Sequence, residues 1–270
     1  MKGDPVTTLA IGIDIGGTGI KGALVDVDSG ELQGARLKKP TPRGGRPTDI
    51  VEVVVQLVTE LLAEVDGADV PVGVCFPAVV LHGRTMSAAN VSNEWIGLEA
   101  EALFEKALGR NIHFVNDADA AGVAEVRYGA AQDTRGLILL TTLGTGIGSA
   151  LILDGDLVPN TELGHLLLDG RDAEKRASFA AKERGRLSWK RWAGRLQKYY
   201  AHLEMLFSPD LFIVGGGVSK HHEQFLPLLT LRAPIVPAAL RNNAGILGAA
   251  ALAVPRVRPD AGSAATDQWS

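Results

Sequence analysis

A glycine-rich loop occurs twice in this chain, each time between two apolar runs, and this limits the folds that the chain can adopt. The first copy is GGTGIKGALV at residues 16–25, and the second is LGTGIGSALI at residues 143–152. The two copies align without a gap, and both following runs end in a turn rich in Asp and Gly. Short, partly β-branched runs on both sides of a turn are typical of a β-hairpin. The match indicates a duplication and hence two related domains.

A glycine loop that binds a nucleotide usually lies between a strand and a helix, whose N-terminus receives the phosphate. In this chain a second predicted strand follows each loop instead. Two hairpins that face each other across a cleft can hold a phosphate chain from both sides, because glycine lets backbone N–H groups approach phosphate oxygens. Either loop alone indicates only a tight turn, but the pair predicts a phosphate site. The predicted phosphate-binding residues are Gly16, Gly17, Thr18, Lys21, Gly144, Thr145 and Gly146.

The two copies differ at two positions that change the local charge. Asp14 aligns with Thr141, and Lys21 aligns with Gly148. A carboxylate beside phosphate is unfavourable unless a cation lies between them, and Mg²⁺ typically binds one or two carboxylates together with phosphate oxygens and water. We therefore predict that Asp14 holds Mg²⁺ through water. Lys21 either offsets phosphate charge or is an ordinary solvated lysine.

The composition is that of an ordinary globular protein. The 270 residues suffice for two domains, with 46% of them apolar and 21% charged. A net charge of -4 provides no overall attraction to nucleic acid or to a membrane. The chain has no apolar run long enough to span a bilayer and no apolar core of a secretory signal, so we expect a cytoplasmic protein. Cys75 is the only cysteine, which excludes internal disulfides and thiolate zinc clusters.

Several motifs resemble those of a known superfamily. DIGGT, the second GTG hairpin and IVGGGVS resemble the actin, hexokinase and heat-shock ATPase superfamily, while NDADAAGVAE and ELGH resemble its ROK family of sugar kinases and repressors. Within that family, FPAVV, AANVSNEW and SPDLFIVGGGVSK resemble the bacterial polyphosphate glucokinases and glucomannokinases. The resemblance runs from about residue 11 to residue 253. It implies an α/β fold of two duplicated actin-like (ribonuclease H-like) domains with a central cleft.

The resemblance also predicts how the chain is divided. Residues 1–120 would form the first domain, with the first hairpin and sugar-binding residues, and residues 121–253 would form the second. Residues 254–270 are rich in Pro, Ala, Gly and Ser, so we expect a disordered tail. The loop on the adenosine side of a nucleotide is predicted to contain Gly215, Gly216 and Gly217.

A candidate catalytic pair lies at the junction of a predicted strand, residues 113–115, and a predicted helix, residues 118–126. Asn116 and Asp117 occupy this junction, where α/β folds bind their ligands. Both residue types are also common N-caps, yet two are more than a cap requires, and Asp119 alone could serve the first turn. In the ROK family the matching asparagine binds sugar and the matching aspartate takes the proton from the attacking hydroxyl. The resemblance gives Asn116 and Asp117 these roles.

The same resemblance implies further sugar-binding residues. Many ROK proteins carry a cysteine-rich zinc knuckle after the ELGH histidine, but LLLDGRDAEKRAS here contains no cysteine, so we expect no structural zinc. His165 would then serve the sugar or a local hydrogen-bond network, or be a buried structural histidine. Glu174 would accept hydrogen bonds from sugar hydroxyls, or be a solvated charge at a helix start. The predicted sugar-binding residues besides Asn116 and Asp117 are Asn90, Glu162, His165 and Glu174.

A basic segment, KERGRLSWKRWAGRLQKYY at residues 182–200, stands out in an acidic chain. At 100° per residue, its aromatic and leucine side chains fill one sector of a helix and its cations lie on both flanks. Surface helices usually mix charge signs, so an extended polyanion is the predicted partner. The resemblance favours polyphosphate, and no base-reading motif favours nucleic acid. The predicted polyphosphate-binding residues are Arg184, Arg186, Lys190, Arg191, Arg195 and Lys198.

These features together predict a kinase that transfers a phosphoryl group to the 6-hydroxyl of glucose, with Mg²⁺ and with polyphosphate and ATP as donors. The rival enzyme is a ROK hexokinase restricted to ATP. A sugar-sensing ROK repressor is the rival from another class, but it needs an N-terminal helix-turn-helix domain, and the first predicted strand begins near residue 9. The sequence leaves open the preferred donor, glucose versus mannose, and monomer versus homodimer.

Overall fold

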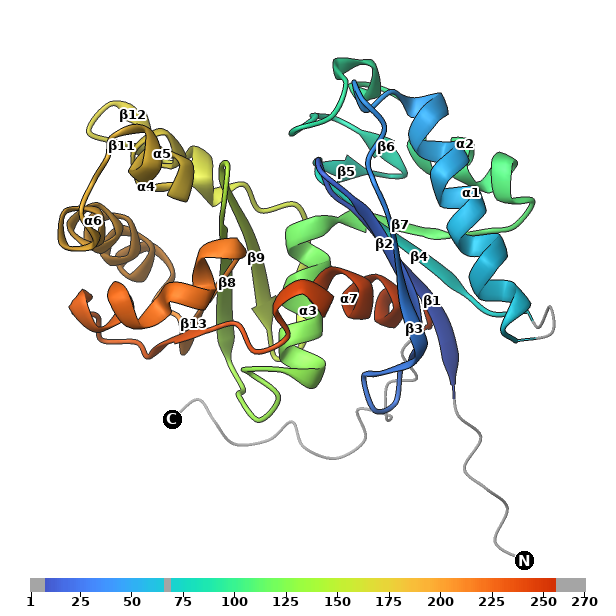
Figure 1. The fold of residues 1–270 in the computed structure, drawn as a ribbon. Coiled ribbons are helices and arrows are strands. Elements are labelled where there is room, and N and C mark those ends of the chain that lie inside the picture. Colours follow the sequence, from blue (N-terminus) through green and yellow to red (C-terminus); the bar gives the residue numbers. More distant parts are fainter. Residues whose placement is uncertain (1–7, 66–68, 256–270) are drawn as a thin grey trace, which may run out of the picture.

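The structure, a computed structural model, describes residues 8–65 and 69–255 and contains two five-stranded sheets (Figure 1). The first sheet consists, in spatial order, of β3 (Glu31–Lys39), β2 (Ile20–Asp26), β1 (Leu9–Ile15), β4 (Val72–Phe76) and β7 (His113–Asn116). The second consists of β10 (Asp156–Val158), β9 (Ile147–Leu153), β8 (Leu137–Leu143), β13 (Leu211–Gly215) and β14 (Ile235–Pro237). Both sheets have three antiparallel strands followed by two that run parallel to the central strand. This shared topology confirms the predicted duplicated α/β fold.

Helices cover the sheets in three layers. The first sheet is covered on its outer face by α1 (Pro47–Ala63) and α2 (Ala100–Leu108). Between the sheets lie α3 (Asp117–Tyr128) and α7 (Ala244–Ala253), packed against each other (Figure 1). The second sheet is flanked by α4 (Glu174–Ala177), α5 (Phe179–Arg184) and α6 (Trp189–Phe207). The helix after the last strand of each sheet has a counterpart in the other half, because α3 follows β7 and α7 follows β14.

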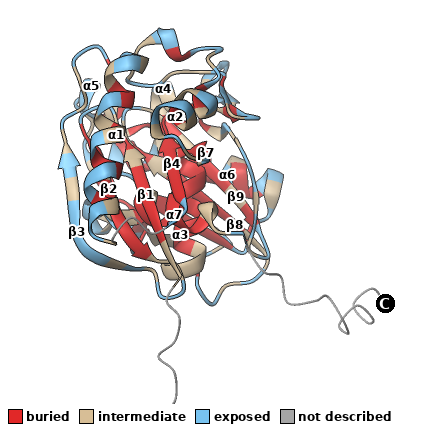
Figure 2. Cartoon of the chain, turned by 90° about the vertical axis from the view of Figure 1, so that its right-hand side faces the viewer, coloured by how far each residue is buried: buried red, intermediate tan, exposed pale blue. Residues whose placement is uncertain are grey.

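The burial pattern follows the hydrophobic periodicity of the sequence. Figure 2 shows buried strands in the interior and helices whose outer faces are exposed. Helix α1 starts at a proline, which fits the first helical position because its missing N–H would have no partner there. Its buried residues recur every three or four positions and pack on the first sheet. They are Ile50, Val51, Val54, Leu57, Val58 and Leu61.

The central helices approach the sheets and each other so closely that glycine is required at the contacts. A Cβ on Gly248 of α7 would lie 1.8 Å from the carbonyl oxygen of Ala120 in α3. A Cβ on Gly73 of β4 would lie 1.9 Å from the carbonyl oxygen of Ala249. Both distances are far shorter than any real contact of a Cβ atom. Backbone touches backbone at these points, which fixes the two sheets relative to each other.

The two glycine loops are β-hairpin tips, as predicted, but they differ in length. In the first hairpin Asp14 lies opposite Lys21, whereas in the second Thr142 lies opposite Gly148. The second tip is one residue shorter, so the ungapped alignment of Asp14 with Thr141 is wrong in the structure. Thr142 is the structural counterpart of Asp14. Thr141 is instead buried, and its hydroxyl is 2.6 Å from the Tyr200 hydroxyl.

The predicted single basic helix is two helices. Helix α5 ends at Arg184. Gly185 and Arg186, which has a left-handed backbone conformation (φ 44°), interrupt the helical structure before α6 begins. Ser188 caps α6, because its hydroxyl oxygen accepts a hydrogen bond from the Arg191 N–H. The predicted apolar sector is confirmed for α6. Its buried residues include Trp192, Leu196, Tyr199, Tyr200 and Leu203.

The predicted domain boundary between residues 120 and 121 falls inside α3. Because α3 continues directly from β7, the end of α3 at Tyr128 is a more natural division, and we propose it instead. The predicted disordered tail lies largely outside the described residues, since only Val254 and Pro255 of it are described. Within residues 8–65 and 69–255, no helix combines the length and apolarity needed to cross a membrane.

The contact between α3 and α7 predicts a large effect of a small substitution. Gly248→Ala should destabilise the protein by about 2 to 3 kcal/mol, because the new methyl group cannot fit against the Ala120 carbonyl. Gly194→Ala is the matched control, since Gly194 lies on α6 with nothing within 4 Å of an added Cβ. It should stabilise by about 0.5 kcal/mol or more. Denaturant unfolding of both variants checks this, and equal stability would contradict the proposed close packing.

Candidate active site

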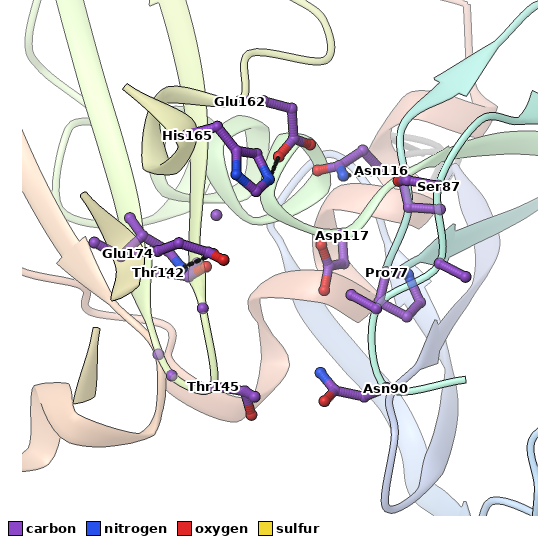
Figure 3. A pocket seen from close by; sticks show the side chains of 18 residues that line it. Pro77, Ser87, Asn90, Asn116, Asp117, Thr142, Thr145, Glu162, His165 and Glu174 are labelled. Atoms are coloured by element: carbon purple, nitrogen blue, oxygen red, sulfur yellow. Dashed lines mark hydrogen bonds and ion pairs between the residues drawn. The ribbon is translucent and has the colours of Figure 1, made fainter. Parts of the chain in front are cut away.

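A cavity of about 450 Å³ lies between the two sheets, a size that suits a small ligand (Figure 3). One wall comes from the first half of the chain and the other from the second. The cavity brings together all six predicted sugar-binding residues, which lie up to 84 positions apart. They are Asn90, Asn116, Asp117, Glu162, His165 and Glu174.

Asn116 is the N-cap of α3. Its Oδ1 accepts hydrogen bonds from the N–H groups of Ala118 and Asp119 at 2.8 and 3.0 Å, and its Nδ2 donates one to the Ala78 carbonyl at 2.9 Å. The cap therefore belongs to Asn116 and not to Asp119, contrary to the alternative raised by the sequence. One amide hydrogen of Asn116 is left to face the cavity. Its predicted sugar contact remains a prediction.

Asp117, the first residue of α3, points into the cavity (Figure 3). Burial is the main cause that raises the pKa of its carboxyl group to about 7, and the nearby carboxylates of Asp14, Glu162 and Asp119 raise it further. The Ala118 N–H opposes the shift. A carboxylate with a pKa near 7 accepts a proton far more readily than an ordinary aspartate. This is the property that a general base at neutral pH requires.

Three polar side chains face Asp117 from the second half of the chain (Figure 3). His165, at the end of a short 3-10 helix (Leu163–His165), has its Nε2 3.9 Å from Glu162 Oε2 and its Nδ1 3.5 Å from Asp172 Oδ2. Burial raises the pKa of Glu162, and His165 opposes that shift. Glu174 Oε2 accepts a hydrogen bond from the Ile147 N–H at 3.3 Å, directly after the second hairpin tip. The carboxylates thus line the wall opposite the candidate base.

Asn90 lies at the rim of the cavity beside the first hairpin. It adopts a left-handed backbone conformation with a φ of 61°, which asparagine tolerates better than most residues. A Cβ on Gly17 would lie 2.7 Å from the Asn90 Cβ. A glycine at this position therefore lets the first hairpin reach the wall of the cavity that carries Asn90.

A second cavity of about 210 Å³ adjoins the first. Asp117, Thr142 and Gly216 line both cavities, so they stand at the junction. Asp14 and Gly215 line only the smaller cavity. The tip of the second hairpin, residues 144–146, lines only the larger cavity. The remaining predicted phosphate-binding residues line neither cavity as described. They are Gly16, Gly17, Thr18, Lys21 and Gly217.

Asp14 fits the chemistry of a Mg²⁺ ligand. Its Oδ2 lies 2.8 Å from Lys21 Nζ, so Lys21 is paired with Asp14 and is not a freely solvated lysine. The described residues contain no group of three or more His, Cys, Asp or Glu side chains arranged to hold a metal ion. Mg²⁺ does not require such a cage, because it is commonly held by one or two carboxylates, water and substrate phosphates. Asp14 lines the second cavity together with Asp117 and Glu125, and the Glu125 oxygens already accept hydrogen bonds from backbone N–H groups, so Asp14 is the carboxylate that fits this role.

Sequence reasoning missed several polar residues that line the cavities, among them Ser87, Glu125, Thr142 and Arg241. Thr142 lies at the junction of the cavities, but the gapless alignment hid its equivalence to Asp14. Arg241 lines the second cavity in a left-handed conformation, and no motif marks it. A cation there has the charge that an anionic ligand would require.

Comparison with known proteins identifies the family of the chain. A model described as the ROK family matches residues 10–186, which is more than half of the chain. The chain belongs to the ROK family. It is similar to a polyphosphate glucokinase of Mycobacterium tuberculosis strain H37Rv, with 46% identity over 244 residues that cover 90% of each chain.

Two solved structures of ROK-like enzymes extend the comparison. The inorganic polyphosphate/ATP-glucomannokinase of Arthrobacter sp. strain KM superimposes with a TM-score of 0.86 at 54% identity, over 91% of this chain and 98% of that one. A ROK family glucokinase of Streptomyces griseus, solved with glucose and AMPPNP, gives a TM-score of 0.73 at 25% identity, over 90% and 98%. The resemblance inferred from the motifs is therefore confirmed.

Burial and nearby carboxylates predict an unusually high pKa for the carboxyl group of Asp117. In the unliganded protein Asp117 should titrate near pH 7 and not near the ordinary value of 3.8. Asp14→Asn removes a negative charge that raises this pKa, so Asp117 should then titrate at lower pH. Carboxyl-carbon NMR of protein labelled with ¹³C-aspartate measures both, with the Asp117 signal assigned by its loss in Asp117→Asn. The exposed Asp28→Asn is the control, and a titration of Asp117 below pH 5 would contradict the proposed environment.

Proposed function

We propose that this protein phosphorylates the 6-hydroxyl of glucose, with polyphosphate and also ATP as phosphoryl donors, and with Asp117 as the general base. The observation that carries the proposal is the position of Asp117 at the junction of two cavities. One cavity is lined by hydrogen-bonding side chains suited to a sugar, and the lining of the other includes three glycines, Asp14 and Arg241. A base between acceptor and donor is the arrangement that phosphoryl transfer requires.

The sugar-binding role rests on the chemistry of the two facing walls. Glu162 and Glu174 offer carboxylate oxygens, which accept hydrogen bonds from neighbouring sugar hydroxyls. His165 lies between the carboxylates of Glu162 and Asp172. In this position its imidazole ring can donate a hydrogen bond to a carboxylate or form one with a sugar hydroxyl. With these groups on one side and Asp117 on the other, one hydroxyl can be directed at the base. Phosphoryl transfer gains most of its rate from such positioning and from neutralised charge.

The phosphate-binding role rests on the hairpin tips and on Asp14. Gly144, Thr145 and Gly146 form the tip that borders the sugar cavity, where their backbone N–H groups can bind phosphate oxygens. Gly215 and Gly216 border the second cavity, which suits the adenosine side of ATP. Asp14 would hold Mg²⁺, which neutralises the charge that develops on the transferred phosphoryl group. Lys21, paired with Asp14, would keep that carboxylate oriented.

Polyphosphate use is supported by the basic segment and by the named relatives. The segment begins next to the second hairpin, because the Ala180 N–H of α5 donates a hydrogen bond to the Gly144 carbonyl at 3.0 Å. A long polyphosphate that leaves the cavity at this tip would therefore meet the cations of α5 and α6. The six cations are not equal, however. Arg195 donates to the Arg176 carbonyl at 3.0 Å and Lys198 pairs with Asp169 at 3.3 Å.

An exposed subset of these cations is therefore better suited to bind polyphosphate. Lys190 and Arg191 lie in the first turn of α6, are exposed and have no ion pair among the described residues. Arg186 is also exposed, in the break between the helices, and within residues 8–65 and 69–255 the Arg184 side chain donates a hydrogen bond only to the Lys175 carbonyl, at 3.3 Å. The ATP-restricted hexokinase remains the alternative function. We further propose mannose as a second acceptor, a cytoplasmic location and the homodimer as the oligomeric state to test first.

The role of Asp117 predicts a strong loss of turnover with preserved binding. Asp117→Asn keeps the size of the side chain but cannot accept the proton, so kcat should fall by about 10²-fold or more. Glucose binding, measured by calorimetry, should persist because the facing wall is unchanged. Coupled assays with glucose and mannose against ATP and polyphosphate test the proposed function at the same time. Turnover of the variant near that of the wild type would exclude Asp117 as the base.

The basic segment predicts a difference between the two donors. Lys190→Glu combined with Arg191→Glu should raise the KM for polyphosphate, with a larger effect for longer chains, because a long polyanion contacts several cations at once. The KM for ATP should change little, since exposed charges outside the cavity are screened beyond about 8–10 Å. Lys106→Glu combined with Arg135→Glu is the control, with the same charge change at exposed positions elsewhere. Equal weakening of both donors would favour the ATP-restricted alternative.

A further inference from the structure

Asn160 links the two halves of the molecule beside the sugar cavity. It follows β10 and lies two residues before Glu162. Its side-chain Oδ1 accepts a hydrogen bond from the Val80 N–H at 2.8 Å, and its Nδ2 donates one to the Val80 carbonyl at 2.8 Å. Val80 belongs to the first half and is buried, so its backbone groups would be costly to leave unpaired. One amide side chain thus satisfies both of them.

The backbone of Asn160 is held in turn by Asp119. Asp119 Oδ2 accepts a hydrogen bond from the Asn160 N–H at 2.7 Å. Asp119 is fully buried in the first turn of α3, and within the described part of the chain its Oδ1 has no hydrogen-bond partner. Burial is the main cause that raises the pKa of Asp119 to about 7. A buried acid with one unpaired oxygen is costly, so its single hydrogen bond to Asn160 indicates a specific role.

Both walls of the sugar cavity are therefore attached to the same helical turn. Asn116 holds the first wall through the Ala78 carbonyl, and Asp119 holds the second wall through Asn160. Asp117, the proposed base, lies between these two attachments. Asn160 then joins the walls to each other through Val80. Helix α3, the first wall and the second wall are thus joined by a closed ring of hydrogen bonds, and the turn of α3 that belongs to this ring carries the proposed base.

We propose that Asp119 and Asn160 are positioning residues for the sugar, which hold the Asn90 side and the Glu162 side of the cavity at a fixed separation across Asp117. This inference rests on the proposed function in taking the ligand of the cavity to be a hexose. A hexose must reach acceptors on both walls at once, so a small movement of one wall removes several hydrogen bonds together. Displacements of about 1 Å can lower rates by about 10²-fold in sites of this kind.

The loop that carries Asn160 has a second, independent attachment. The Ser149 hydroxyl on β9 accepts a hydrogen bond from the Leu163 N–H at 3.0 Å and donates to the Thr161 carbonyl. Loss of the Asn160 side chain would therefore leave the loop fixed to its own sheet. Only its link to the first half of the molecule would break, which allows a clean test.

Asn160→Gly is the decisive variant. Asn160 has a φ of 59°, which glycine adopts without strain, so this substitution removes the amide and keeps the backbone. The KM for glucose should rise by about 10-fold, which corresponds to the loss of about two hydrogen bonds between the displaced wall and the sugar. The KM for either donor should stay within about twofold. Amide exchange at Val80 should accelerate, because its N–H loses its acceptor. Asp154→Gly is the matched control, since Asp154 is also left-handed (φ 50°) and its side chain accepts a hydrogen bond from the Gly136 N–H, which does not line the sugar cavity.

Variants of Asp119 test the second member of the pair. Asp119→Asn keeps an oxygen that can accept from the Asn160 N–H, so it should retain a glucose KM near that of the wild type. Asp119→Ala removes the acceptor and should reproduce the KM increase of Asn160→Gly. The glucose KM of the double variant Asp119→Ala with Asn160→Gly should be close to that of either single variant. Each substitution removes a different hydrogen bond, but both open the same ring that joins the two walls.

The outcomes separate this inference from the proposed function. A glucose KM of Asn160→Gly within twofold of the wild type, or unchanged amide exchange at Val80, would overturn the positioning role. Lower thermal stability with equal changes in all KM values would also overturn it, because that result describes a general structural role. If the wild type fails to phosphorylate glucose, the proposed function is wrong, and Val80 exchange still decides whether Asn160 holds the two walls together.

Discussion

The close contact between α3 and α7 is the constraint on which the rest of the structure depends. Side chains cannot intervene where Gly248 meets the Ala120 carbonyl, so the helices are held at the shortest possible separation. Each helix also packs on the sheet of the other half, since α7 lies against β1 and β4 and α3 lies against β8 and β9. The two sheets are thereby set at a fixed distance, and the space that remains beyond the helix N-termini is the active-site cavity.

The chemistry of the site follows from this placement. Because α3 begins at the edge of the cavity, its first residue, Asp117, is partly withdrawn from water and lies near other carboxylates. Burial and the negative neighbours raise the pKa of Asp117 to about 7. The same turn carries Asn116 and Asp119, which hold the two walls. One helical turn therefore supplies both the candidate base and the attachments that direct a ligand toward it.

The sequence predicted the fold well, because the fold depends on local signals that recur. Both hairpins, the strand before Asn116 and the apolar face of α6 followed from periodicity and turn residues. The predictions from sequence failed where contacts between distant residues determine the local structure. The shorter second hairpin depends on pairing across the strands, and the break before α6 depends on Gly185 and on the Ser188 cap. No local pattern marks Asn160, whose role depends on Val80 in the other half of the chain.

The duplicated scaffold becomes a directed site through differences at matching positions. Asn116 begins the helix of the first half and Asn243 that of the second, but the next residue is Asp117 in one and Ala244 in the other. The hairpins differ in the same sense, since Asp14 of the first half has a carboxylate where Thr142 of the second half has a hydroxyl. A fully symmetric pair would place four carboxylates around one cavity, where their mutual repulsion would leave some of them protonated. In the proposed reaction, the Asp14 carboxylate serves a metal ion and the Asp117 carboxylate accepts a proton, with acceptor and donor approaching Asp117 from different sides.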